Sequence, residues 1–117
     1  MLQLNAKNKI LLSIHPADFR KGIDGLAAVC KQKLASDPFE GTIFVFRNRA
    51  GTAIKILLYD GQGFWLCHKR LSKGKLQWWP KSIKSAYNLH ATQLQILLYN
   101  GNPDLAKCAP QWRNIKV

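Results

Sequence analysis

The sequence predicts an α+β fold, in which an N-terminal strand and an amphipathic helix pack on a four-stranded antiparallel meander and a short helix follows. Apolar residues recur every three or four positions between Phe19 and Leu34, which is typical of one helix face. Short β-branched and aromatic runs alternate with turns from residue 42 to residue 79. The length of 117 residues suits one core, so we expect a single domain over 1–117, with 1–8 and 103–117 flexible.

The first strand and the long helix are expected in the N-terminal third of the chain. Lys9 to His15 is a short apolar run that ends before a proline and predicts a strand. Asp18 is expected to cap the N-terminus of the helix, and Asp37-Pro38 to end it. Arg20 and Lys21 would then lie in the first turn, where positive charge opposes the helix dipole and could hold a phosphate.

The predicted meander consists of four short strands, at residues 42–49, 53–59, 64–71 and 76–79. Alternation within the first of them places Phe44 and Phe46 on one face and directs the other large side chains to the opposite face: Ile43, Val45, Arg47 and Arg49. Pro80 would stop the last strand. We therefore expect one apolar sheet face under the helix and basic residues at the edges and turns.

The C-terminal part predicts a linker and one short helix. Residues 81–88 are polar and are expected to form the linker. Thr92 and Gln95 have the spacing of a capping box ahead of an apolar run that reaches Leu98. Gly101 is expected to end this helix.

The charge of the chain favours an anionic partner. Eighteen Lys and Arg residues against six Asp and Glu give a formal net charge of +12 and a pI near 10.0, which indicates nucleic acid as the leading partner class. A membrane is the weaker choice, because no apolar run approaches the ~20 residues of a spanning helix. The polar N-terminus does not suit a signal peptide, so a cytoplasmic location is expected.

The cysteine pattern does not favour a disulfide framework or a metal site. Cys30, Cys67 and Cys108 are odd in number and widely spaced, which suits reduced thiols. No Cys-x-x-Cys pair exists, and a zinc site assembled from Cys30 and Cys108 with His15 or His90 lacks any ligand spacing. We expect no metal and no cofactor.

Basic and aromatic residues interleave in the second half of the meander, where residues 69–84 contain no acidic side chain. Two functions fit this pattern. In the first, basic side chains neutralise phosphates while Trp78 or Trp79 stacks on an unpaired base; the basic candidates are Arg47, Arg49, Lys55, Lys69, Lys73 and Lys75. In the second, the apolar sheet surface docks on a protein and the charge only steers assembly around DNA. A merely solvated basic surface is the remaining alternative.

Adjacent Lys69 and Arg70 must point to opposite faces of their strand. Arg70 lies on the side of Phe64 and Leu66, where the helix is expected to pack, and its guanidinium suits a buried pairing with Asp18 or Asp24. Lys69 would then face outward.

Five strings of this chain resemble, in the same order, the TnpB accessory protein of the insertion-sequence sixty-six family, also called Orf2-like protein. They lie at residues 18–26, 37–41, 44–49, 60–66 and 69–74, and the resemblance extends from about Ile14 to Leu98. It implies a small bacterial protein encoded in a mobile element beside a larger transposase and needed for transposition in a role that is not chemically defined.

The acidic residues do not favour a catalyst of strand transfer. Two-metal chemistry needs convergent carboxylates, and the six acidic residues are scattered: Asp18, Asp24, Asp37, Glu40, Asp60 and Asp104. Asp60 ends an apolar strand, yet Asp-Gly at a turn needs no metal. We expect a non-catalytic accessory protein of transposition that binds nucleic acid with weak sequence preference. Duplex DNA, single-stranded DNA and RNA remain open as ligands, the transposase is an expected partner, and the oligomeric state is undecided.

Overall fold

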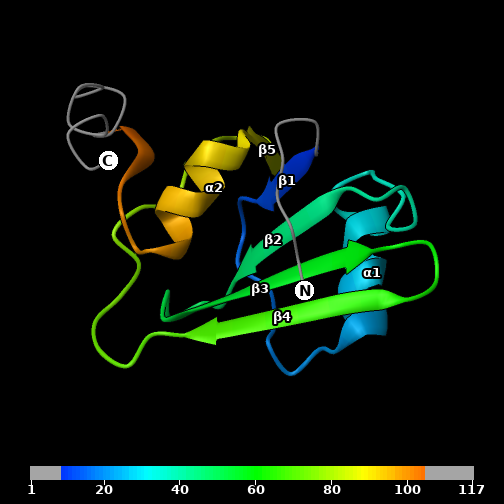
Figure 1. Cartoon of the computed structure of the whole chain (residues 1–117), viewed down its shortest axis with the longest axis horizontal. Coiled ribbons are helices and arrows are strands. Elements are labelled where there is room, and N and C mark those ends of the chain that lie inside the picture. Colours follow the sequence, from blue (N-terminus) through cyan, green and yellow to red (C-terminus); the bar gives the residue numbers. More distant parts are fainter. Residues whose placement is uncertain (1–8, 105–117) are drawn as a thin grey trace.

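A five-stranded mixed sheet with a helix against each face forms the core of the computed structural model, which describes residues 9–104 (Figure 1). The strands are β1 (Ile10–Ser13), β2 (Ile43–Arg47), β3 (Ala53–Tyr59), β4 (Phe64–Arg70) and β5 (Ala86–Leu89), and the helices are α1 (Ile23–Gln32) and α2 (Ala91–Leu98). The order across the sheet is β4-β3-β2-β1-β5. The predicted α+β class is confirmed, but the prediction of four purely antiparallel strands is wrong in detail.

The parallel pair β1 and β2 lies inside the sheet. Ile10 pairs with Ile43 and Leu12 with Val45 in parallel register, and α1 supplies the crossover that parallel strands need. β3 and β4 continue from β2 as an antiparallel hairpin series. The sequence predicted the first strand and the hairpins but gave no sign that the first strand would enter the sheet.

One predicted strand is missing and one strand was not predicted. Leu76 to Trp79 do not form a strand; they pack against the α2 side of the sheet, and the Trp79 Nε1–H donates to the Ser13 carbonyl at 3.0 Å. β5 arises instead from the segment predicted as a linker, and pairs antiparallel with β1 from Ser13↔Ala86 to Ile10↔Leu89. Its four residues are too few for alternation to stand out from a polar neighbourhood.

Both faces of the sheet are buried, which corrects the expectation of a single apolar face. Phe44 and Phe46 lie under α1, where they join a cluster that includes Leu26 and Cys30. Ile43 and Val45, which alternate with these phenylalanines on β2, face α2. They belong to a second cluster, whose other members include Ile10, Leu12, Ile54, Ile56, Leu94 and Leu97. The predicted division of β2 between two faces is confirmed. We call the two sides the α1 face and the α2 face.

The helix ends differ from the predicted ones. Gly22 is the N-cap of α1, so Asp18 does not cap it. At the start of α2 the His90 backbone N–H donates to Gln93 Oε1 at 2.8 Å, so the capping box begins at His90 rather than at the predicted Thr92. Asn100, with φ 59°, takes the left-handed position expected near Gly101.

The predicted C-terminal tail begins inside the fold. Pro103 is buried, and Asp104 accepts a hydrogen bond from Trp78 Nε1 at 3.1 Å. The remaining residues of the predicted flexible ends, 1–8 and 105–117, lie outside the described part, as does Cys108.

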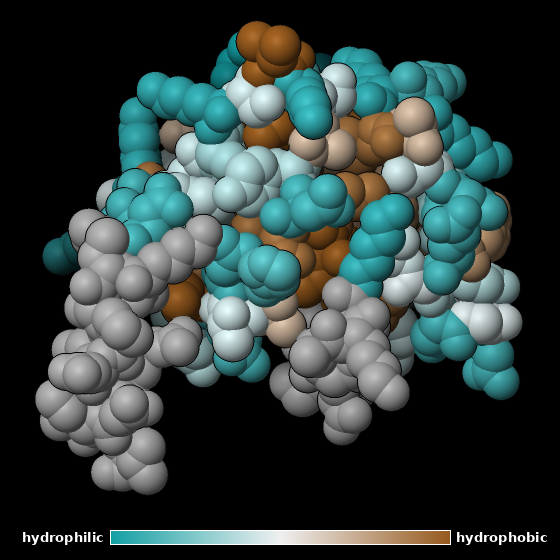
Figure 2. Space-filling view, turned by 90° about the horizontal axis from the view of Figure 1, so that it is seen from above, coloured by the Kyte–Doolittle hydropathy of each residue, from teal (hydrophilic) through white to brown (hydrophobic). Residues whose placement is uncertain are grey.

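Hydrophilic side chains cover most of the surface seen from above, and hydrophobic side chains gather between them (Figure 2). Within residues 9–104, neither helix has the length and apolar character needed to cross a membrane.

Candidate nucleic-acid interface

The sheet topology gathers basic residues at one end of the strands. β1, β2 and β4 finish at this end, while β3 and β5 begin there, as the pairs Ser13↔Ala86, Arg47↔Ile54 and Ala53↔Arg70 show. These strand ends, the loops that leave them and the end of α1 together carry most of the described Lys and Arg residues. We call this surface the basic end, and its cationic members are Arg20, Lys21, Lys33, Arg47, Arg49, Lys69, Arg70, Lys73, Lys75, Lys81 and Lys84.

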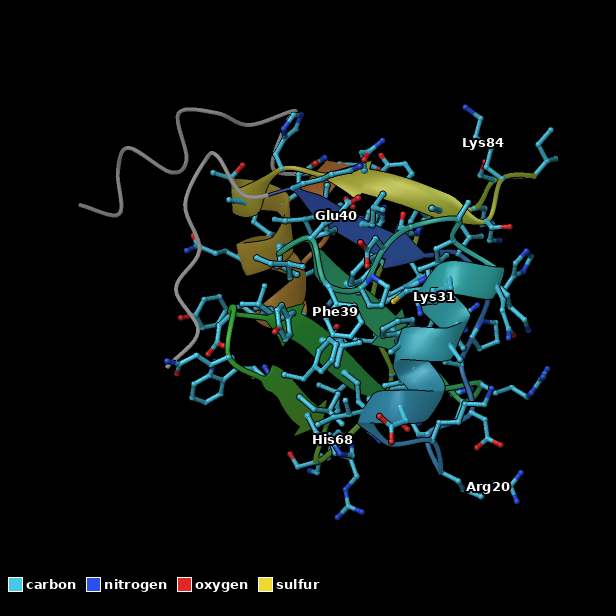
Figure 3. The ribbon with its side chains drawn as sticks, turned by 90° about the vertical axis from the view of Figure 1, so that its right-hand side faces the viewer. Arg20, Lys31, Phe39, Glu40, His68 and Lys84 are labelled. Atoms are coloured by element: carbon cyan, nitrogen blue, oxygen red, sulfur yellow. The ribbon has the colours of Figure 1, made fainter. Side chains whose placement is uncertain are left out.

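Two hollows lie at the basic end, beneath the loop that connects β1 to α1. The first has a volume of about 350 Å³, and Arg20, Asn48 and Arg49 are among its lining residues. The second, of about 200 Å³, is lined in part by Lys21, Lys33 and Arg49. Arg49 therefore contributes to both. Figure 3 shows Arg20 and Lys84 projecting away from the molecule on the side of α1.

Lys55 holds the loop between β1 and α1 in place. Its side chain is only 8% exposed, and its Nζ donates to the carbonyls of Phe19 at 3.0 Å and Lys21 at 3.2 Å. The ammonium group also lies 5.0 Å from the centre of the Phe19 ring, within cation–π range. Lys55 was predicted to contact phosphate. The structure gives it an internal role instead, because its donors are already directed at carbonyls.

Asn48 fixes the turn between β2 and β3. Its Oδ1 accepts hydrogen bonds from the backbone N–H groups of Thr52 at 2.9 Å and Ala53 at 3.1 Å, and its Nδ2 donates to Thr52 Oγ1 at 2.9 Å. This network holds the backbone next to the exposed Arg49, which lines both hollows.

Arg47 is a half-buried cation with no carboxylate partner among residues 9–104. Its guanidinium carbon lies 5.7 Å from the centre of the Trp79 ring, and its buried Nε has no hydrogen-bond partner in that part of the chain. Burial, and then the nearby charge of Arg49, lower the pKa of Arg47 from its usual value. The charge of Arg47 is therefore stabilised mainly by an aromatic ring, and an anion at this end would stabilise it further.

The ion pair predicted for Arg70 does not form. Arg70 and Asp24 are both exposed, and Asp18 instead pairs with Arg20, whose Nη2 lies 2.8 Å from Asp18 Oδ2. The face predicted for Arg70 is correct, since it shares the α1 face with Phe64 and Leu66. The pairing was wrong because Asp18 lies in a loop before the helix and reaches its neighbour two residues along the chain.

The other predicted nucleic-acid ligands divide between exposed and packed positions. Lys73 and Lys75 are exposed in the loop after β4. Lys69 is exposed but on the α2 face, where its Nζ donates to the Leu98 carbonyl at the end of α2. Trp78 and Trp79 are half-buried, and the indole N–H of each has a partner within the fold. The structure therefore brings Arg47, Arg49, Lys69, Lys73 and Lys75 to the basic end, although the ammonium of Lys69 is directed to the Leu98 carbonyl. Both indoles have packing roles.

The family model described as IS66 Orf2 like protein matches residues 8–106 of this chain. The chain belongs to that family. Two uncharacterized proteins of Sinorhizobium fredii are similar to it: y4hO is 32% identical over all of this chain and 99% of its own length, and y4jC is 38% identical over 93% of this chain and 92% of its own length. No solved structure matches the chain. Membership associates this IS66 Orf2-like protein with an insertion sequence and with transposition, as the resemblance had implied.

The IS66 Orf2-like chain offers no grouped metal ligands in its described part: across residues 9–104, no cluster of three or more His, Cys, Asp or Glu side chains could hold an ion. Cys30 is buried, which raises the pKa of its thiol to about 12, and Cys67 is half-buried. Both thiols are free.

Sequence reasoning missed Asn48 and assigned Lys55 to phosphate binding, whereas both residues position the loops of the IS66 Orf2-like basic end. Asn48 carried a local signal, because an Asn at the start of a turn often accepts hydrogen bonds from backbone N–H groups that follow it. Lys55 carried a weaker one. It alternates with Ala53 and Leu57 on a buried face, which requires a lysine there to be paired or to reach solvent.

Proposed function

We propose that this protein is a non-catalytic accessory factor of transposition that binds DNA through phosphate contacts made by the basic end. One observation carries the proposal. Three loops, which leave the ends of β1, β2 and β4, converge on one surface, and the one ion pair among residues 9–104 is the local contact between Asp18 and Arg20. Such a surface repels itself unless an anion joins it.

The geometry of the helices supports weak sequence preference. α1 buries Leu26, Val29 and Cys30 against the sheet, and α2 buries Leu94 and Leu97. A recognition helix must present several side chains to base edges in the major groove. The basic end presents loops instead, and these suit the regularly spaced phosphates of a backbone.

Salt-dependent binding tests the proposal. We expect fluorescence anisotropy with duplex, single-stranded and RNA probes to show an affinity whose logarithm falls linearly with the logarithm of the salt concentration. Each neutralised phosphate contributes a slope of about −0.9 on duplex or about −0.7 on single strands. Arg49→Gln should weaken binding and reduce the magnitude of the duplex slope by about 0.9, the contribution of one neutralised phosphate.

The matched control is Lys9→Gln, which removes an exposed positive charge next to Ile10, at the opposite end of β1. It should leave the slope of the parent protein unchanged. Equal losses from the two variants would mean that net charge alone, rather than the basic end, binds the probe.

Docking on the transposase is the second candidate, and it is favoured by exposed hydrophobic side chains. Ile83 is fully exposed, Tyr99 is 86% exposed and Phe39 is 53% exposed, and a hydrophobic patch is visible from above (Figure 2). If the purified protein fails to bind any probe at low salt yet co-purifies with the transposase of its element, docking is the correct function and direct DNA binding is not.

A further inference from the structure

β4 is an outer strand of the sheet, and one side of its backbone has no partner among residues 9–104 (Figure 1). Hydrogen bonds at the two ends of the β3–β4 hairpin, from Asp60 N–H to the Gly63 carbonyl at 3.0 Å and from Leu71 N–H to the Thr52 carbonyl at 2.9 Å, fix the alternation. Trp65, Cys67 and Lys69 direct their backbone groups to β3 in this alternation. The remaining strand residues direct theirs outward: Phe64, Leu66, His68 and Arg70.

This edge lacks three of the features that commonly prevent pairing with another strand, namely shortness, a bulge and a proline. β4 has seven residues, pairs with β3 along its whole length without a bulge, and contains no proline. Long, regular edges of this kind are templates for a further strand. The positive charges at its C-terminal half limit which strand can pair with it.

The two halves of β4 differ in character, so that two antiparallel copies of the strand would place aromatic residues opposite basic ones. Aromatic Phe64 and Trp65 occupy the first two positions, basic Lys69 and Arg70 the last two, and Cys67 lies at the centre. We propose that two copies of this protein associate through their β4 strands, paired antiparallel about a two-fold axis at Cys67. Leu66 then pairs with His68 of the second copy, and Phe64 with Arg70.

The proposed register satisfies every outward backbone group of β4. Phe64, Leu66, His68 and Arg70 form the hydrogen-bonded pairs, and Cys67 faces its counterpart in a non-hydrogen-bonded pair. On the α1 face, the ring of Phe64 meets the guanidinium of Arg70. On the α2 face, Trp65, which is 43% exposed, lies opposite Lys69, whose ammonium also donates to the Leu98 carbonyl of its own copy. Cross-strand cation–aromatic contacts of this kind are favourable.

The positions of the charged residues favour this register over the two registers shifted by one residue. Pairing centred on His68 places Arg70 opposite Leu66 instead of opposite Phe64. Pairing centred on Leu66 leaves neither Lys69 nor Arg70 opposite an aromatic residue. Parallel pairing in register stacks Lys69 on Lys69 and Arg70 on Arg70, which is repulsive. The register centred on Cys67 also brings the acidic turn at Asp60 of one copy towards the basic loop at Lys73 of the other.

Assembly in this way creates a continuous ten-stranded sheet, because each copy contributes the five strands of its own sheet. The two β4 strands run in opposite directions, so the basic ends of the two copies face opposite ways. If the basic end binds DNA as proposed above, the dimer holds two DNA segments apart along the strand direction.

A proline substitution tests the pairing. The His68 N–H points outward, so His68→Pro removes no bond to β3 but blocks two of the new ones. His68→Ala is the matched control, because both variants lose the edge-to-face contact with the Phe19 ring, 5.7 Å between centroids. By sedimentation of the full-length chain, we expect a dimer for the parent and for His68→Ala and a monomer for His68→Pro, with a cooperative thermal transition in all three. Equal dimer content in the two variants, or a monomeric parent at concentrations of tens of micromolar, overturns the proposal.

Disulfide formation at Cys67 tests the register independently. A non-hydrogen-bonded pair places its Cα atoms about 4.5 Å apart, within the range of a disulfide. In a Cys108→Ser variant, treatment with diamide should give a covalent dimer, and Cys67→Ser in the same background should abolish it. A covalent dimer that persists without Cys67 overturns the register. DNA anisotropy on the monomeric His68→Pro variant separates the two proposals, since the basic end of each copy is intact there.

Discussion

A lysine occupies the buried third position of β3, and its ammonium group is stabilised by carbonyl groups rather than by a carboxylate. Lys55 donates to the Phe19 and Lys21 carbonyls, so one side chain connects the sheet to the loop that precedes α1. The loop in turn carries Arg20 and Lys21 to the basic end. A residue that does not contact the proposed ligand therefore positions two that can.

Lys55→Met tests this positioning role. The variant keeps the length and apolar stem of the side chain but leaves two carbonyls without their donor, so we expect the free energy of unfolding to fall by about 1–3 kcal/mol. Denaturant unfolding measures the change. Lys31→Met, on the exposed side of α1, is the control and should change stability by no more than about 0.5 kcal/mol. Equal effects would show that the Lys55 contacts contribute nothing.

Asp18 and Arg20 give the basic end a local dependence on pH. The side-chain hydrogen bonds from Arg20, and then its backbone N–H, lower the pKa of Asp18 from 3.8 to about 2. Because the folded pKa is depressed, the stabilising contribution is complete above pH 3.8 and is lost as the pH falls through about 2. NMR titration of the carboxyl carbons should locate Asp18 near pH 2, and Arg20→Gln should return it towards 3.8.

Asp60 is the internal control for that titration. Its pKa is lowered by the backbone N–H groups of Gln62 and Gly63 and by the indole of Trp65, none of which involves Arg20. If Arg20→Gln shifted the pKa values of both Asp18 and Asp60, the cause would be the lower net positive charge of the protein rather than the loss of the pairing between Asp18 and Arg20.

At the scale of elements, the segment just after α1 contains a residue in an unfavourable conformation. Ala35 has a φ of 50°, in the left-handed region that costs a residue with a Cβ roughly 1–2 kcal/mol. The chain uses this conformation to turn away from α1, where the Ser36 N–H donates to the Cys30 carbonyl at 2.9 Å. Glycine adopts it without strain.

Ala35→Gly should therefore raise the free energy of unfolding, by up to about 1 kcal/mol after the entropy lost by glycine is deducted. Ala28→Gly, inside α1, should lower it by about 1 kcal/mol. Thermal unfolding of the two variants measures this difference, because Ala35→Gly should raise the melting temperature and Ala28→Gly should lower it. A loss of stability in both variants would mean that glycine entropy outweighs the strain at Ala35.

Across the whole molecule, local patterns predicted the elements and long-range pairing decided the sheet. Alternation and turn residues gave β2, β3 and β4, because hairpins depend on residues close in sequence. The position of β1 between β2 and β5 could not be predicted, since its apolar run suits an edge strand as well as an inner one. Most residues of the basic end were recognised from charge alone, but the internal roles of Lys55 and Trp79 depend on loops whose course no local pattern specifies.

The pairing of β1 with β5 also has a consequence for synthesis of the chain. Ile10 lies beside Leu89 in the finished sheet, so the first described strand is completed by the last. Contacts between residues so distant in sequence slow folding, and a nascent chain that has not yet exposed β5 leaves the outer backbone of β1 unpaired. Folding of this protein is therefore expected to be completed only after β5 has left the ribosome. Until then, the apolar residues of β1 are accessible to chaperones and to other unfolded chains.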